Sequence, residues 1–246
     1  MAAPRFFVEQ PLSVDAHIAL PAAVAHHART VLRLRDGDPI VLFNGSGGEY
    51  HARLAAASGA GTLQAEVIRF DPVEREASLQ ITLIQAQATS DKIDWVVEKA
   101  VEIGVARVIV TGTARSTVRL DETRRARRVQ HWRELAIAAC CQCGRNRPPA
   151  ILAAPSLAVA VTHAGDAQLR WMLDPAAADA IAPAPSDVRR IAMTVGPEGG
   201  FDSDEVQHLA QAGYRAISLG PRILRTETAG LVAAAACLAL SGALSC

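Results

Sequence analysis

Residues 191–201 read IAMTVGPEGGF, a short run of apolar and β-branched residues that leads directly into a glycine-rich turn. A run of this length is typical of a buried strand, and ligands of open α/β sheets bind beyond the carboxyl ends of the strands. The three glycines allow the backbone to lie against a flat ligand and to present amide groups to it. Taken alone, the turn is equally compatible with ordinary turn chemistry.

A second loop of this kind follows residues 216–219 and reads GPRILRTETA over residues 220–229. Its hydroxyls and its carboxylate suit the capped start of a helix. Ile223 and Leu224 do not fit a solvated helix start, whereas apolar side chains beside backbone amides suit an adenine ring and a methionine side chain. Neither loop has the spacing of a Rossmann dinucleotide fingerprint or of a P-loop. We therefore expect the two loops to form one ligand pocket.

Strands and helices alternate around these loops. Predicted strands lie at residues 79–85, 107–110, 169–173, 191–195 and 216–219, and predicted helices at 91–104, 121–141, 202–212 and 228–240. Ser90 is expected to cap the first helix, and Asp202 with Glu205 has the spacing of a capping box. Such alternation indicates an α/β fold in which helices cover a parallel sheet.

The first part of the chain has a different sequence pattern. Residues 1–72 contain short apolar runs separated by turn residues such as those at 36–39 and 44–48, which predicts a small β-rich domain. The polar stretch 71–76 has the composition of a linker. We therefore expect two domains, at residues 1–72 and 73–246.

The composition indicates a folded protein without an overall field that attracts nucleic acid or lipid, because 25 basic residues balance 25 acidic ones. An odd number of cysteines, five, indicates a reduced cytoplasmic setting. Cys140, Cys141 and Cys143 lack the second ligand pair of a structural zinc site, so no metal site is predicted. The apolar stretch 229–244 is shorter than the roughly 20 residues of a bilayer span, and we expect no membrane partner.

A third motif, AIAACCQCGRNR at residues 136–147, joins the two loops in a pattern that resembles a known family. Together with PRFF at 4–7, HARTVLR at 27–33 and EKAVEIG at 98–104, these motifs resemble the bacterial 16S rRNA uridine N3-methyltransferases, the RsmE group within the SPOUT class. The likeness covers most of the chain in the same order.

The resemblance implies a PUA-like barrel that binds RNA, followed by a SPOUT-type parallel sheet with a C-terminal trefoil knot around S-adenosylmethionine. It also implies a homodimer that acts on 16S rRNA within the small ribosomal subunit. The residues that it assigns to the cofactor lie in the predicted loops: Leu173, Gly196, Pro197, Gly199, Gly200, Leu219, Gly220, Ile223, Leu224 and Thr228.

For catalysis we expect a guanidinium beside the uracil carbonyl oxygens to stabilise the N3 anion, with Arg225 as the first candidate and Arg145 as the second. Glu198 or Glu227 could accept the proton, and either could instead hold an arginine or cap a helix. Nine arginines crowd residues 115–147, Arg119 among them, and form a local basic surface. The predicted RNA contacts are Arg29, Arg33, Arg115, Arg145, Arg147 and Arg222. The competing hypotheses are a ribosome-assembly factor without catalysis and a SPOUT enzyme that methylates transfer RNA.

Overall fold

The computed structural model describes residues 3–55, 62–118 and 121–244, so Arg119 lies outside the described residues. The chain divides into two compact units. Unit 1 comprises Met1–Glu76 and Cys140–Pro148, and unit 2 comprises Ala77–Ala139 and Pro149–Cys246. Each unit is described by itself.

Unit 1 is built on a sheet whose five strands, within the described residues, have the order β1-β3-β4-β5-β2. The strands are β1 Arg5–Phe7, β2 His17–Ala19, β3 Pro39–Phe43, β4 Glu49–Ala55 and β5 Gln64–Asp71. β1 pairs with β3 in parallel and the other pairs are antiparallel. Alternate residues such as Ile40, Leu42 and Leu54 enter one buried cluster. The β-rich N-terminal fold predicted from the sequence is therefore confirmed.

One helical segment of unit 1 was not predicted. α1 Ala22–His26 continues into a π-helical turn, η1 His27–Val31, within the HARTVLR motif. Ala28 is fully buried, whereas Val31 and Leu32 are exposed. The segment packs through a few small apolar side chains, so its sequence carries little helical periodicity.

The second stretch of unit 1 is held by charged side chains from the first stretch. Arg5 donates to Oε2 of Glu49 at 2.5 Å and to Oδ1 of Asn146 at 2.6 Å. Arg75 donates to the same Glu49 oxygen at 2.9 Å and to the carbonyl of Gly144 at 2.9 Å. Glu49 and Arg5 are largely shielded from solvent, whereas Arg75 is partly exposed, and together these bonds fix the turn at residues 144–146 in unit 1.

Unit 2 is built on a sheet of six described strands in the order β11-β9-β10-β6-β7-β8, and every neighbouring pair is parallel. The strands are β6 Gln80–Ala86, β7 Arg107–Thr111, β8 Ala150–Ala154, β9 Leu169–Leu173, β10 Arg190–Val195 and β11 Arg215–Ile217. This sheet confirms the predicted α/β class. The trefoil knot stays a prediction.

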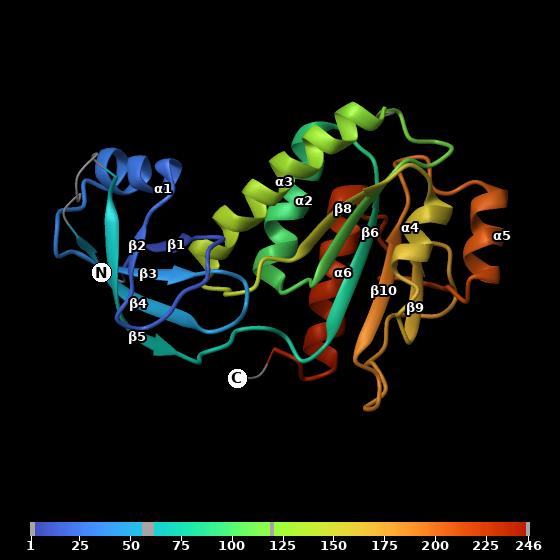
Figure 1. Ribbon diagram of the computed structural model, residues 1–246. Helices are drawn as coiled ribbons and strands as arrows, with labels where there is room; N and C mark the ends of the chain where they lie inside the picture. Colours follow the sequence, from blue (N-terminus) through green and yellow to red (C-terminus); the bar gives the residue numbers. More distant parts are fainter. Residues whose placement is uncertain (1–2, 56–61, 119–120, 245–246) are drawn as a thin grey trace. The chain divides into compact units, whose positions relative to one another are not determined.

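Helices cover both faces of this sheet (Figure 1). They are α2 Ser90–Ile103, α3 Glu122–Cys143, whose last turn belongs to unit 1, α4 Leu157–His163, α5 Ser203–Gln211 and α6 Thr226–Leu240. α6 packs on α2, β6 and β10, whereas α4 packs on β7, β8 and α5. β8 and α4 were not predicted, because their alanine-rich sequence gives no clear period.

Alternation along the strands explains how both faces are buried. Ile84 belongs to the cluster that includes Leu157 and Leu209, on the side of α4 and α5. Leu83, the residue before Ile84 in β6, points to the opposite face of the sheet, towards α6. A Cβ added to Gly230 of α6 would lie 2.7 Å from Cδ1 of Leu83. Glycine at this position therefore allows α6 to approach the sheet closely.

Most helix ends follow the sequence signals, although α6 begins at Thr226 rather than at the predicted residue 228. Asp202 and Glu205 form both bonds of a capping box at the start of α5, as predicted. Gly104 ends α2 in the left-handed conformation with φ 99°. The prediction that Ser90 caps α2 is wrong. Thr89 has the extended backbone of an N-cap, and Ser90 is already helical. Neither side chain forms a capping hydrogen bond.

Among the described residues, no helix is both long enough and apolar enough to cross a membrane.

Candidate functional site

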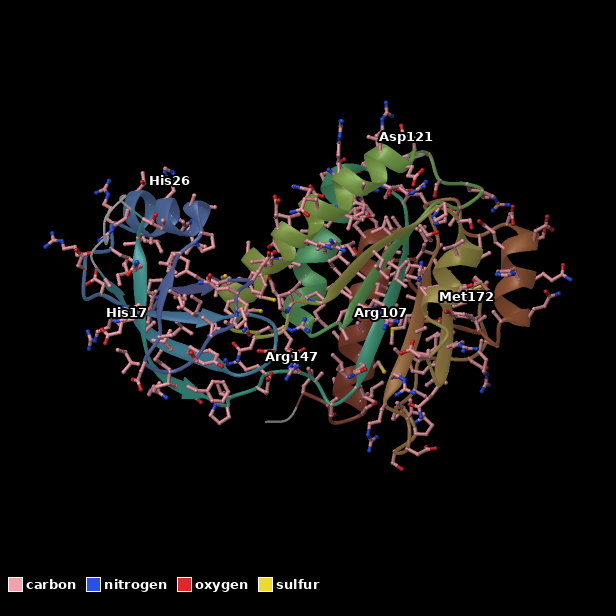
Figure 2. All side chains as sticks on the ribbon, in the orientation of Figure 1. His17, His26, Arg107, Asp121, Arg147 and Met172 are labelled. Atoms are coloured by element: carbon pink, nitrogen blue, oxygen red, sulfur yellow. The ribbon has the colours of Figure 1, made fainter. Side chains whose placement is uncertain are left out.

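A cavity of about 240 Å³ lies at the carboxyl ends of β9, β10 and β11. Its walls come from the ends of these strands and from the loops that follow them, within residues 172–175, 195–201 and 217–224. Met172, labelled on β9 in Figure 2, is part of the first wall. This is the edge of an open α/β sheet at which ligands bind.

The cavity brings together most of the loop residues that the sequence singled out. Seven of the ten line it: Leu173, Gly196, Pro197, Gly200, Leu219, Gly220 and Leu224. Gly199 is instead packed beside Arg115, whose Cδ would lie 3.4 Å from a Cβ at this position. Ile223 is exposed, with 83% of its surface accessible. Thr228 lies in the first turn of α6, and the cavity wall there is Ala229.

The glycines of the two loops are required by the backbone. A Cβ on Gly196 would lie 3.2 Å from the amide nitrogen of Phe201, so a side chain there would require the loop to shift by a few tenths of an ångström. Gly200 and Gly220 have φ values of 70° and 101°, a region that favours glycine. The turns therefore expose bare backbone at the cavity.

Thr226 ties the two loops together inside unit 2. Its hydroxyl donates to the carbonyl oxygen of Gly196 at 2.6 Å and accepts from Nε2 of Gln85 at 3.0 Å. Both Thr226 and Gln85 are buried. The start of α6, the loop after β10 and the end of β6 are thus joined by two hydrogen bonds, which fixes the spacing of the cavity walls.

Lys92 is a charged residue of this site that sequence reasoning missed. Its Nζ lies 2.6 Å from Oε1 of Glu198 and 3.3 Å from Oε2 of Glu227. It therefore joins the start of α2 to both loops. Lys92 is one of only two lysines in a chain with 25 basic residues, and this was a signal that the sequence offered.

The ion pairs shift the pKa values of the groups that form them. The hydrogen bond from Lys92 lowers the pKa of Glu198 below its ordinary value, and the same bond raises the pKa of Lys92. Glu198 is thus held as a carboxylate, and its basicity is reduced. This arrangement suits a positioning group better than a proton acceptor.

The arginines near the cavity have different surroundings. Arg222 lines the cavity. Arg225 precedes α6 with 83% of its side chain exposed, and its nearest recorded partner is Oε1 of Glu227 at 4.0 Å. Arg115 donates to the carbonyl oxygen of Gly199 at 2.7 Å and so holds the glycine-rich loop. The Arg225 guanidinium is therefore exposed and free to move towards a substrate.

The predicted arginines of unit 1 have partners of their own. The Arg145 side chain is only 4% exposed and donates to Oε2 of Glu76 at 2.5 Å. Arg147, labelled in Figure 2, is half exposed and donates to Oε1 of Glu74 at 3.2 Å. Arg29 forms an ion pair with Asp36 and donates to the carbonyl of Leu34. Arg33 is exposed, with a positive φ of 56°.

The donors and walls of the cavity fit S-adenosylmethionine. Leu219 and Leu224 offer apolar surface to an adenine ring, and the turn at Gly196 offers backbone groups. Asp174 and Glu198 place carboxylates on the lining, which suits a ligand that carries an ammonium and a sulfonium cation. The volume is slightly below the usual range of about 300–1,000 Å³, so such a ligand would fill the cavity and reach its mouth. Among the described residues, no group of side chains could hold a metal ion.

Two families match this chain. The RNA methyltransferase domain matches residues 75–238, and the RNA methyltransferase PUA domain matches residues 20–68. The chain is 31% identical over 245 residues to the ribosomal RNA small subunit methyltransferase E of Mycobacterium bovis, a match that covers 95% of this chain and 90% of the relative.

Solved structures agree with this result. A ribosomal RNA small subunit methyltransferase E from Neisseria gonorrhoeae, bound to S-adenosyl methionine, has a TM-score of 0.85 and 33% identity over 97% of this chain and 98% of its own. A Legionella pneumophila protein described as a methyltransferase, in complex with SAM, has a TM-score of 0.89 and 30% identity with the same coverage. The resemblance expected from the motifs is confirmed, and the chain belongs to the family of RNA methyltransferases that includes the ribosomal RNA small subunit methyltransferase E proteins.

Proposed function

We propose that this chain transfers the methyl group of S-adenosylmethionine to N3 of a uridine in 16S rRNA. The observation that carries the proposal is the single cavity formed by the turns at Gly196 and Gly220, with donors that fit the cofactor. Two solved structures with the same architecture hold S-adenosylmethionine, and the Neisseria gonorrhoeae and Mycobacterium bovis relatives are named for the RNA of the small ribosomal subunit.

When bound, the cofactor supplies a methyl group that is already activated by its sulfonium. The chain must therefore align uracil N3 with that methyl group and favour the loss of the N3 proton. We assign the stabilisation of the N3 anion to Arg225, because its exposed guanidinium is free to approach the uracil carbonyl oxygens at the mouth of the cavity.

Glu198 and Lys92 would hold the walls of the cofactor cavity in position. Glu198 lines the cavity and is held by Lys92, whose second partner, Glu227, begins α6. The lowered pKa of Glu198 makes it a weak base, so we assign it to positioning, with the N3 proton passing to solvent. Arg145, the second candidate for catalysis, is buried against Glu76, and we assign it to the structure of unit 1.

For RNA binding we retain Arg222 at the cavity and the exposed Arg33 and Arg147 of unit 1. Such contacts to phosphate give salt-dependent affinity and little sequence information. We assign residues 1–72 to RNA docking and residues 73–246 to cofactor binding, with the turn at 144–148 attached to the first region.

We further propose a homodimer that acts on the small ribosomal subunit in the cytoplasm. α2 and α6 pack on each other, and both expose apolar side chains, among them Trp95, Val232 and Leu240. Exposed apolar side chains on neighbouring helices support a subunit contact.

The test is to incubate the purified chain with S-adenosylmethionine and small ribosomal subunits from a strain that lacks this methylation. Digestion of the RNA to nucleosides and mass spectrometry should show N3-methyluridine. Methylation of ribose or of transfer RNA alone would contradict the proposal in favour of a related knotted enzyme. Calorimetry without heat on addition of S-adenosylmethionine would favour an assembly factor without catalysis.

A further inference from the structure

Unit 2 contains a second and larger cavity, of about 550 Å³, that the proposed function does not use. It lies at the carboxyl ends of β7 and β8, beside the first residues of α4 and α5. Its volume is within the range of pockets that bind small ligands, and it opens at the same edge of the sheet as the cofactor cavity.

The floor of this cavity is apolar. Val110, Ala153 and Leu157 line it, and Leu157 is buried in the cluster between α4 and the sheet. Its rim carries the carboxylates of Asp202 and Glu205. Arg125 also lines the cavity, so charges of both signs surround an apolar floor, which suits a flat, uncharged ring.

His208 gives this cavity a polar group without a partner in the described part of the chain. Its Nε2 is buried and makes no hydrogen bond, although the side chain lines the cavity. Buried polar atoms are nearly always hydrogen-bonded in folded proteins. A rotation of the imidazole ring about χ2 would bring a ring nitrogen to the cavity surface, where it can donate to or accept from the edge of a heterocycle.

The two cavities share a wall. Oε1 of Glu205, at the second cavity, accepts from the amide of Ala114 at 2.8 Å. The next residue, Arg115, donates to the carbonyl oxygen of Gly199 in the loop that closes the cofactor cavity. Val206, the residue after Glu205 in α5, lines the cofactor cavity, so the two cavities adjoin at the start of this helix.

We propose that the second cavity binds an unstacked nucleobase of the substrate RNA, a neighbour of the methylated uridine in the strand. The inference rests on the proposed function and adds a specificity site to it. Single-stranded RNA is recognised by bases that leave the stack, are buried against flat or apolar side chains and form hydrogen bonds at their edges. The floor and His208 supply these two interactions.

Ala158→Phe tests the proposal because Ala158 is exposed on α4 and lines the cavity, so a phenyl ring there fills the mouth without disturbing the core. The matched control is Val159→Phe, since Val159 is the next exposed residue of α4 and is not part of the lining. We expect Ala158→Phe to raise the KM for small ribosomal subunits about tenfold, given the usual contribution of a stacked base. The control should keep the wild-type KM, and both variants should bind S-adenosylmethionine with unchanged affinity.

His208→Leu and His208→Gln separate burial from hydrogen bonding. Loss of Nε2 in the leucine variant should raise the KM for the RNA substrate about fivefold, and the glutamine variant should recover part of the loss. If both variants keep the wild-type KM, His208 does not contact a base and the assignment of this edge contact is overturned.

Filter binding of the substrate RNA without cofactor distinguishes the inference from the proposed function. If the wild-type chain binds RNA but methylates no uridine, the proposed function is contradicted. In that case, weaker RNA binding by Ala158→Phe than by Val159→Phe would still support the base-binding cavity. Equal RNA affinity and equal KM for these two variants would overturn the inference. A loss of S-adenosylmethionine affinity in Ala158→Phe would also overturn it, because the cavity would then act on the cofactor site.

Discussion

Nζ of Lys92 lies 2.6 Å from Oε1 of Glu198, so the first turn of α2 is joined to the glycine-rich loop after β10 by a hydrogen-bonded ion pair. The same Nζ lies 3.3 Å from Glu227. One ammonium thus separates two carboxylates that would otherwise repel each other at the cavity.

Lys92→Met should loosen the cofactor cavity. With the ammonium removed, Glu198 and Glu227 repel each other, and we expect the affinity for S-adenosylmethionine to fall about fivefold, the effect of a partly exposed ion pair. Calorimetry measures this change. Lys92→Arg should recover most of the affinity, and Lys99→Met is the control, since Lys99 pairs with Glu98 and Glu102 on the same helix. An unchanged affinity in Lys92→Met would show that the ion pair has no positioning role.

Arg225→Ala should separate chemistry from cofactor binding. Loss of a group that stabilises developing negative charge typically reduces kcat about 100-fold or more. The affinity for S-adenosylmethionine should stay within about twofold of the wild type, because the Arg225 side chain is exposed and makes no close bond to the cavity wall. Arg215→Ala is the control, as Arg215 is similarly exposed and pairs with Asp179 at 3.5 Å. Near-normal turnover in Arg225→Ala would reject its assignment.

Thr226→Val should destabilise unit 2 and weaken cofactor binding together. Valine has nearly the same shape, but it removes the hydrogen bond to the Gly196 carbonyl and leaves Nε2 of Gln85 with the longer contact, 3.4 Å, to the carbonyl of Ala86. The free energy of unfolding should fall by about 1–3 kcal/mol. Urea unfolding measures the loss, and Thr226→Ser, which keeps the hydroxyl, should restore most of it. Equal stability of the valine and serine variants would contradict the tie between the two loops.

Glu49 should make the stability of unit 1 depend on pH. Burial raises the pKa of this carboxyl, but the hydrogen bonds from Arg5 and Arg75 outweigh burial and hold the pKa below the ordinary value of 4.5. Because the folded-state pKa is the lower one, the ion pairs stabilise the fold above pH 4.5, and this contribution is lost as the pH falls through the folded-state pKa.

Glu49→Gln removes that contribution. We expect about 2 kcal/mol less stability at neutral pH and a flatter dependence of stability on pH in the acid range. Denaturant unfolding at several pH values measures both. Glu66→Gln is the control, because Glu66 is exposed on β5. If Glu49→Gln loses stability in acid as steeply as the wild type, other carboxyl groups dominate the pH dependence of stability.

Local signals in the sequence predicted much of unit 2. The capping box at Asp202 and the left-handed glycine at Gly104 depend on a few adjacent residues, so they are readable without the fold. The placement of the turns at Gly196 and Gly220 on one cavity follows from the general rule that ligand sites lie at one edge of a parallel sheet.

Contacts between distant residues could not be predicted in this way. Lys92 and Glu198 are 106 residues apart, and no local pattern pairs them. The turn at 144–148 joins unit 1 because Arg5 and Arg75 reach its carbonyls and Asn146. The helical pattern of α3 continues up to that turn, so periodicity gives no sign of a boundary within it.

The strand order also has a consequence for biosynthesis. β10 pairs with β6 on one side and with β9 on the other, and it is translated more than a hundred residues after β6. Until β10 leaves the ribosome, β6 presents an open edge on a strand that is almost wholly buried in the folded protein, which is a site for mispairing and aggregation. Nascent chains of this protein should therefore depend on chaperones between the synthesis of β8 and that of β10, and slowing translation within that window should lower the yield of folded enzyme.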